Sequence, residues 1–254
     1  MTMGARQRFA GRSVLVTGAA GEIGSTVARG LVEEGAKVTL VDRDSEALTA
    51  LAAELGARAH PVTTDITVES EVVRAVDEAA NFGDGLHGVF NNAGIEGPVG
   101  PITDLDLGRL EQVLKVNVWG AAAVLKHCLR HLGPGGVVVQ TGSTASLAGA
   151  PHMGPYVASK HALLGLTKVA SREVAARGVR VVALCPGPVV GRMMDRINDG
   201  RSAANTATSA NATTLDEGRY ASVEEVASAA LFLLSDEAGF VTGTHLVVDG
   251  GRLA

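Results

Sequence analysis

Tyr156 and Lys160 stand four residues apart in a stretch of helical period, so their side chains share one face of a predicted helix. A phenol has a reference pKa of about 10, and a nearby ammonium stabilises the phenolate and brings that pKa toward neutrality. Ser143 follows a predicted strand, where its hydroxyl can hold the same substrate oxygen. Each residue alone is compatible with packing or a solvated surface. Together they predict proton exchange between Tyr156 and a substrate oxygen.

A second chemical pattern is a glycine-rich turn, formed by Gly18, Gly21 and Gly24 after the first predicted strand. Such a turn lets the backbone approach a pyrophosphate, and the N–H groups of the helix that follows face the phosphates. A tight strand-to-helix turn also needs glycine for geometry alone, so this signal depends on its place after the first strand. The turn predicts a dinucleotide site.

Asp42 ends the second predicted strand, where a carboxylate accepts hydrogen bonds from the adenosine ribose and repels a 2′-phosphate. This position favours NAD(H) over NADP(H). The neighbouring Arg43 could instead attract the 2′-phosphate, and Asp42 could be merely the cap of the next helix.

The elements that must position these residues alternate between short β-branched runs and longer amphipathic stretches. Apolar strands joined by crossover helices predict an α/β fold, a Rossmann-like doubly wound parallel sheet with helices on both faces. The length of 254 residues suits one domain, 1–254. The predicted strands are 13–17, 37–41, 58–63, 88–91, 137–141, 180–184 and 245–248, and the predicted helices are 23–34, 45–55, 69–81, 107–131, 156–177 and 223–234.

Residues 191–220 interrupt this alternation, because Ser, Thr, Asn, Ala and Gly dominate there and neither a strand nor a strong helical period is visible. A long insertion of this kind is usually a binding loop. We expect a mobile substrate segment in which Met193 and Met194 form an adaptable apolar lid and residues 202–214 stay mobile until a ligand binds. By topology, the expected substrate contacts are Ile95, Glu96, His152, Met153 and Met193.

The composition excludes several classes of partner. The net charge of −5 is not concentrated in a basic block, which argues against nucleic acid and anionic membranes. We expect no signal peptide and no membrane span, and with only two cysteines a reducing cytoplasm fits best. His127 and His131 share a helical face but lack the glutamate of a zinc-protease helix, so no metal site is expected.

The combination of motifs resembles the classical short-chain dehydrogenases/reductases over nearly the whole chain. The shared motifs are the Tyr156-Val-Ala-Ser-Lys160 segment with Ser143 upstream, Asn91-Asn92-Ala93-Gly94, Asp65, Asn117, Pro186-Gly187 and Val248-Asp249-Gly250-Gly251.

The resemblance implies an oxidoreductase with a tetrad of Asn117, Ser143, Tyr156 and Lys160, in which Asn117 holds a water behind Lys160. It implies that Asp65 contacts adenine, that Asn91 and the backbone after it line the adenosine side, and that Val189 meets the nicotinamide carboxamide. It also implies that the chain forms a homotetramer through helices 107–131 and 156–177. The substrate would be a small alcohol or ketone. The local sequence around Ile95 and Glu96 is similar to that of reductases of cyclic ketones and diketones. The expected cofactor contacts are Gly18, Gly21, Glu22, Ile23, Gly24, Asp42, Arg43, Asp65, Ile66, Asn92, Ala93, Gly94, Tyr156, Lys160, Pro186, Gly187 and Val189.

Two positions depart from the family pattern. Glu22 stands where the middle glycine of TGxxxGxG would be, which gives the TGxxGxxG spacing of the extended branch with its epimerases and dehydratases. Glu22 could repel the pyrophosphate or point away at a favourable helix N-terminus. Gly191 replaces a frequent threonine that contacts the nicotinamide amide. A further alternative is a dinucleotide-binding or regulatory protein without turnover, because fold does not fix function.

Overall fold

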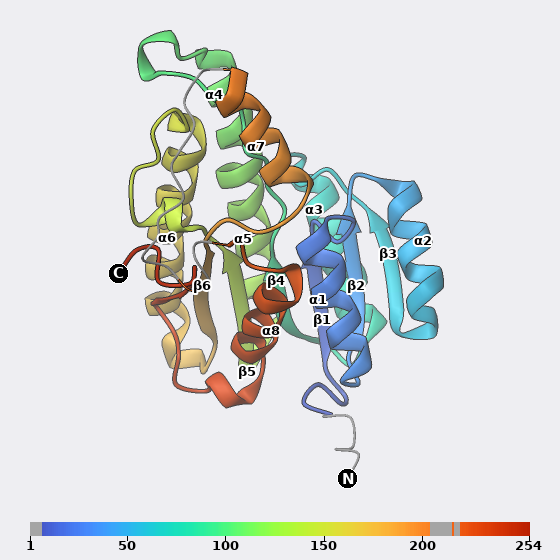
Figure 1. Cartoon of the computed structure of the whole chain (residues 1–254). Coiled ribbons are helices and arrows are strands. Elements are labelled where there is room, and N and C mark those ends of the chain that lie inside the picture. Colours follow the sequence, from blue (N-terminus) through green and yellow to red (C-terminus); the bar gives the residue numbers. More distant parts are fainter. Residues whose placement is uncertain (1–6, 204–214, 216–218) are drawn as a thin grey trace.

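The computed structural model describes residues 7–203, 215 and 219–254 and contains a seven-stranded, all-parallel sheet (Figure 1). The strand order is β3-β2-β1-β4-β5-β6-β7, which confirms the doubly wound fold. The strands are β1 Ser13–Thr17, β2 Lys37–Asp42, β3 Ala59–Thr63, β4 Leu86–Asn91, β5 Leu132–Thr141, β6 Arg180–Pro186 and β7 His245–Val248.

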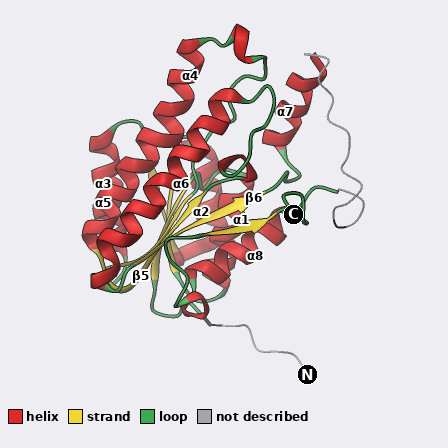
Figure 2. Cartoon of the chain, turned by 90° about the vertical axis from the view of Figure 1, so that its left-hand side faces the viewer, coloured by secondary structure: helices red, strands yellow, loops and turns green. Residues whose placement is uncertain are grey.

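Helices cover both faces of the sheet, as Figure 2 shows with the sheet between two helical layers. The alternation of side chains along β1 explains this, because Val14 and Val16 join one buried cluster while Leu15 joins the other. The first cluster takes in apolar residues of α1, α2 and α8, and the second those of α3, α5 and α6. The helices are α1 Glu22–Glu33, α2 Ser45–Leu55, α3 Glu69–Phe82, α4 Leu107–Leu114, α5 Ala121–His131, α6 Gly154–Val174, α7 Arg192–Ala203 and α8 Val223–Leu234.

Two helical expectations need correction. The predicted helix 107–131 is divided, because a π-helical turn, Lys115–Gly120, separates α4 from α5 and carries Asn117. The interpretation of Asp42 as a helix cap is wrong, since α2 is capped by Asp44, whose carboxylate accepts the N–H of Ala47 at 3.0 Å.

The expectation that residues 191–220 lack a helix is also wrong, because α7 spans twelve of them. Helix-breaking and polar residues hide its period, yet Met194 and Ile197 are buried three residues apart and Met193 packs against them. In Figure 1, α7 stands above the sheet. Of the segment expected to be mobile, residues 204–214 and 216–218 lie outside the described residues.

The strand order reverses beside β1, which pairs with β2 on one side and β4 on the other. Open α/β sheets bind ligands outside the carboxyl ends of the strands at such a switch point.

Among the described helices, none is long and apolar enough to cross a membrane. The two histidines singled out on α5 bind carboxylates of α3, with His127 at 2.8 Å from Glu69 and His131 at 3.3 Å from Asp77. Within the described ranges, no group of three His, Cys, Asp or Glu side chains could hold a metal ion.

Candidate active site

A cavity of about 750 Å³ runs along the carboxyl ends of the strands, from the glycine turn to α7. This volume lies in the usual range of ligand pockets. Tyr156, Lys160 and Ser143 line it, as do sixteen of the seventeen expected cofactor residues, Gly24 being the exception.

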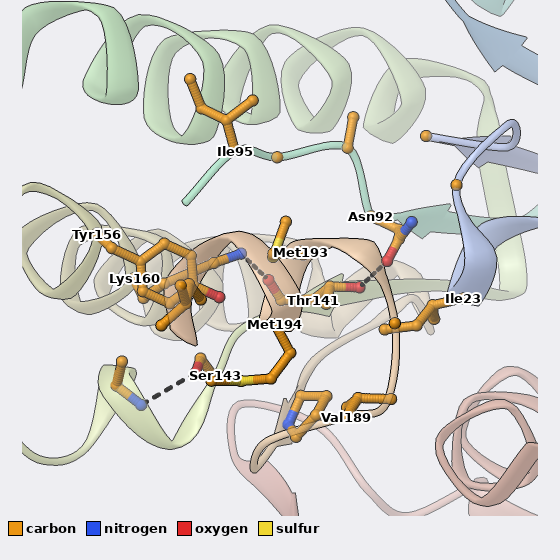
Figure 3. A pocket seen from close by; sticks show the side chains of 18 of the residues that line it. Ile23, Asn92, Ile95, Thr141, Ser143, Tyr156, Lys160, Val189, Met193 and Met194 are labelled. Atoms are coloured by element: carbon orange, nitrogen blue, oxygen red, sulfur yellow. Dashed lines mark hydrogen bonds between the residues drawn. The ribbon is translucent and has the colours of Figure 1, made fainter. Parts of the chain in front are cut away.

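Lys160 lies in the second turn of α6, buried beside Tyr156, and its Nζ donates to the main-chain oxygen of Thr141 at 2.7 Å (Figure 3). The same Nζ is 5.5 Å from the centroid of the Tyr156 ring. Burial lowers the pKa of Lys160 to about 8. The i, i+4 spacing has therefore placed both groups at one end of the cavity, as the sequence predicts.

The Tyr156 phenol departs from the electrostatic expectation. Burial, with a smaller contribution from the Glu96 carboxylate, raises its pKa to about 12, although a hydrogen bond with the Ser143 hydroxyl lowers it. Burial therefore outweighs the stabilisation of the phenolate by the Ser143 hydroxyl. The Tyr156 phenol therefore keeps its proton at neutral pH.

Ser143 follows β5 and caps a short 3-10 turn, Thr144–Ser146. Its Oγ accepts the N–H of Ala145 at 3.1 Å, and its own N–H donates to Ser146 Oγ at 3.1 Å. These reciprocal bonds form a capping box that fixes the direction of the Ser143 hydroxyl. Figure 3 shows Ser143 on the same side of the cavity as Tyr156.

Asn117 does not line the cavity but lies behind it, buried in the π-helical turn. Its Oδ1 accepts the N–H of Ile95 at 2.8 Å, and its Nδ2 donates to Ile95 O at 2.8 Å and to Ser159 Oγ at 3.0 Å. The side chain thereby fastens the segment after β4 to α6. Its direct effect is on the position of Ile95, which lines the cavity.

The glycine turn depends on Gly18 and Gly24. Gly18 has φ +66°, and a Cβ there would lie 2.9 Å from Ala93 Cα. A Cβ on Gly24 would lie 2.1 Å from Gly18 O, so the first turn of α1 packs directly on the loop. Gly21 has an ordinary φ of −77°. The two glycines shared with the family pattern are therefore the sterically required ones, and the side chain of Glu22 leaves the turn intact.

Thr17 and Thr141 organise the cavity floor and were not singled out in the sequence. Thr17 Oγ1 accepts the N–H groups of Asn92 and Ala93 at 2.9 and 3.1 Å, and Thr141 Oγ1 donates to Asn92 Oδ1 at 3.1 Å (Figure 3). Their places at the ends of β1 and β5 are the sequence signal that identifies them. Asn91, expected to line the adenosine side, is buried and donates to Ala121 O and Gln140 Oε1.

Asp42 lies in the cavity wall with both oxygens oriented. Its Oδ2 accepts the N–H of Ala20 at 3.1 Å, and its Oδ1 accepts the N–H of Asp44 at 3.1 Å. Arg43 and Asp65 line the same end. Thr67 donates to Asp65, which lowers the pKa of that carboxyl.

The other end of the cavity is apolar. Ile95, Met153 and Met193 line it as expected, and α7 adds Met194 and Ile197. Glu96 and His152 do not line the cavity. Glu96 lies behind it and pairs with Arg196, while His152 has φ +67° and its carbonyl oxygen accepts the N–H of Gly100.

Comparison with known proteins decides the family. A family model described as enoyl-(acyl carrier protein) reductase matches residues 18–252. The chain belongs to the short-chain dehydrogenase/reductase family. A curated relative in this family, the 2,5-dichloro-2,5-cyclohexadiene-1,4-diol dehydrogenase of Sphingobium indicum, is 37% identical over 250 residues, which cover 97% of this chain and 98% of the relative.

Solved structures agree with this family assignment. NAD⁺-bound xylitol dehydrogenase matches with a TM-score of 0.87 and 32% identity, covering 96% of this chain and 99% of its own. A short-chain dehydrogenase from Burkholderia cenocepacia in complex with NADP matches with a TM-score of 0.84 and 31% identity, covering 97% and 100%. This short-chain dehydrogenase/reductase is therefore an oxidoreductase with a Rossmann-like fold.

Proposed function

We propose that this chain transfers a hydride between NAD(H) and a small, cyclic secondary alcohol or ketone, with Tyr156 as the acid/base. The observation that carries the proposal is that Tyr156, Lys160 and Ser143 meet at the apolar end of the cavity. The glycine-rich turn and Asp42 form its other end, here called the nucleotide cradle. An acid/base site of this kind suits oxidation of a CH–OH group.

The residues present fit a dinucleotide. Gly18 and Gly24 shape a loop whose close backbone approach a Cβ would block, and α1 begins directly after it, so its N–H groups are available to phosphates. The adenosine half would be held by Asp42, Asp65 and Ile66, and the nicotinamide half by Lys160, Gly187 and Val189. The bound nicotinamide ring supplies the redox chemistry by accepting or giving the hydride.

The protein's own contribution is to move one proton and to hold one oxygen. During oxidation, the hydroxyl proton of the substrate passes to the Tyr156 oxygen, the carbinol carbon loses hydride, and a C=O bond forms. Ser143 donates to the substrate oxygen and fixes its position. Lys160 stabilises the phenolate form of Tyr156 by its charge. Reduction runs the same steps in reverse, with neutral Tyr156 giving its proton.

Asp42 supports NAD(H) as the cofactor. Its carboxylate lies in the cavity wall and is oriented by the N–H groups of Ala20 and Asp44. A fixed negative charge there accepts ribose hydroxyls and repels a 2′-phosphate. Similar structures bind NAD⁺ in one case and NADP in another, so this residue carries the assignment for this chain.

The apolar end supports an uncharged substrate. Met153, Met194 and Ile197 are buried together there, and Arg196 on the same wall is paired with Glu96 at 2.5 Å. An anionic substrate would have to compete with that carboxylate. A cyclic diol is named as the substrate of the Sphingobium relative, which favours a carbocyclic alcohol here.

The test is turnover of a panel of cyclic and linear secondary alcohols and ketones with NAD(H) and NADP(H). Tyr156→Phe should lower kcat by roughly 100-fold or more, because it removes the acid/base. Tyr220→Phe, the same change at the chain's other tyrosine, should stay within about 2-fold. Binding of NADH without turnover of any panel member would favour the dinucleotide-binding or regulatory alternative, and a strong preference for NADP would overturn the role of Asp42.

We also propose a homotetramer, as the family resemblance implies. Trp119 in the π-helical turn and Val169 on α6 are 62% and 56% exposed, which is unusual for large apolar side chains. Light scattering on the purified protein tests this, and Trp119→Glu should reduce the assembly to smaller species. A monomer at micromolar concentration would contradict the proposal.

A further inference from the structure

The side chain of Glu22, at the start of α1, reaches the first residue of α7. Its Oε1 and Oε2 lie 3.3 and 3.2 Å from the main-chain nitrogen of Arg192, which donates to them. Arg192 is the first residue of α7, so its N–H has no partner within the helix. The Glu22 carboxylate therefore caps α7 from a different part of the chain, 170 residues away.

Gly191 makes this contact possible. Its φ of +146° disfavours any side chain, and a Cβ there would lie 2.1 Å from Glu22 Oε2 and 2.8 Å from Glu22 Cδ. The atom in the way is the mobile end of a side chain, so a larger residue at 191 would push Glu22 off the Arg192 N–H. The two departures from the family pattern, Glu22 and Gly191, are thus in direct contact and depend on each other.

The ion pair with the Arg192 side chain adds little. Arg192 Nε lies 3.7 Å from Glu22 Oε1, and the Arg192 side chain is 70% exposed. Exposed pairs at this distance contribute only weakly because water screens them. The backbone N–H is thus the group that Glu22 holds.

The anchored turn carries part of the substrate wall. Met193 and Met194 follow Arg192 directly, line the cavity, and belong to one apolar cluster with Tyr156 (Figure 3). One turn later, Arg196 pairs with Glu96 behind the opposite wall. Two carboxylates therefore hold α7 in place. Glu22 belongs to the glycine-rich turn, and Glu96 belongs to the segment after β4.

We propose that Glu22 is a positioning residue that anchors the first turn of α7 to the glycine-rich turn. The anchor also holds Met193 and Met194, here called the methionine wall, and it requires glycine at position 191. The link joins the substrate wall to the nucleotide cradle in the protein without ligands. It rests on the proposed function only for the role of the methionine wall, because the anchor itself does not require catalysis.

Hydrogen–deuterium exchange of residues 192–203 in the cofactor-free protein tests the anchor directly. Glu22→Ala should make the first turn of α7 exchange about 5-fold faster, the size expected for losing a helix cap. Glu22→Asp should do the same, because it keeps the charge but is one methylene too short. Arg192→Met should leave exchange unchanged within about 2-fold, because the exposed ion pair adds little. Glu33→Ala is the matched control for Glu22→Ala, since it removes an exposed glutamate at the other end of α1, and it should also leave exchange unchanged.

A double-mutant cycle tests the dependence between the two positions. Gly191→Ala should speed exchange in the wild-type background, and its effect should be smaller when combined with Glu22→Ala, because the displaced carboxylate is already gone. Unchanged exchange in Glu22→Ala, or full additivity of the two substitutions, would overturn the proposal. Neither result depends on whether the enzyme turns over any substrate.

Steady-state kinetics give the second readout. With the methionine wall displaced and the Tyr156 site intact, Glu22→Ala should raise the substrate KM by about 5-fold while kcat stays within about 2-fold. A loss confined to kcat would contradict a positioning role. If Tyr156→Phe proves fully active while the exchange results hold, the proposed chemistry fails and the anchor stands.

Discussion

The guanidinium of Arg196 on α7 covers the carboxylate of Glu96, with Nε 2.5 Å from Oε1 and the Glu96 side chain only 14% exposed. Glu96 is also close enough to Tyr156 to raise the pKa of the phenol. The charge next to the Tyr156 phenol therefore depends on the position of α7.

A pH profile tests this relationship. In the proposed mechanism oxidation needs the Tyr156 phenolate, so kcat/KM for oxidation should rise with pH toward the pKa of Tyr156. Glu96→Gln removes a negative charge that raises this pKa, so the rising limb should move to lower pH. Arg196→Met exposes that charge, so the limb should move to higher pH. Arg192→Met is the control on the same helix, and shifts of equal sign in the two variants would contradict the argument.

Ser143 gives a second test at the phenol. Its hydroxyl lowers the pKa of Tyr156 and, in the proposed mechanism, donates to the substrate oxygen. Ser143→Ala should reduce kcat by about 100-fold, as expected for losing one donor to a reacting oxygen. The rising limb for oxidation should move to higher pH in the same variant. Ser143→Thr keeps the hydroxyl and should recover most of the rate, and an equally inactive threonine variant would point to packing as the cause.

The strands, the doubly wound topology and the Tyr156–Lys160 pair could be predicted because each depends on local sequence. Strand residues alternate between the two faces, and an i, i+4 spacing brings two side chains together wherever the helix lies. Thr17 and Thr141 could have been found by the same reasoning, since both end a strand at the carboxyl edge of the sheet.

The contacts of Glu22 and Asn117 could not be predicted from spacing. Glu22 binds Arg192 from 170 residues away, and Asn117 binds Ile95 across the fold. The helix α7 was missed for a related reason. Asn198, Asp199 and Gly200 are poor helix formers, and burial of Met194 and Ile197 against the cavity outweighs their propensities.

The glycine turn predicts a difference between two similar substitutions. Gly24→Ala places a Cβ 2.1 Å from Gly18 O, which is rigid backbone, so the turn must shift at a cost of about 1–3 kcal/mol. NADH affinity should fall by at least about 10-fold, measured by fluorescence titration, and the melting temperature should fall with it. Gly21→Ala meets the same oxygen at 3.2 Å and should be tolerated. Equal losses in the two variants would contradict the assignment of Gly24 as the required position.

Asp42 predicts the cofactor preference. Asp42→Ala removes the carboxylate from the cavity wall and leaves Arg43 beside it, so NADH affinity should fall by about 10-fold and NADPH affinity should rise. Asp44→Ala is the comparison. Because Asp44 caps α2, this change should lower the unfolding free energy by about 1 kcal/mol without reversing the preference. An Asp42→Ala variant that still rejects NADPH would show that another group excludes the 2′-phosphate.

Substitution of Asn117 can separate two roles for its side chain. The family resemblance implies that it holds a water in a proton relay, whereas its side chain here binds both main-chain groups of Ile95 and the Ser159 hydroxyl. Asn117→Ala should leave those partly buried groups without partners and lower the unfolding free energy by about 1–3 kcal/mol, measured by urea denaturation. Because Ile95 lines the cavity, the substrate KM should also rise. Asn117→Asp keeps the acceptor for the Ile95 N–H but places a buried carboxylate oxygen against Ile95 O, so it should be destabilised at least as much. A variant with unchanged stability and KM but a lower kcat would favour the relay over the positioning role.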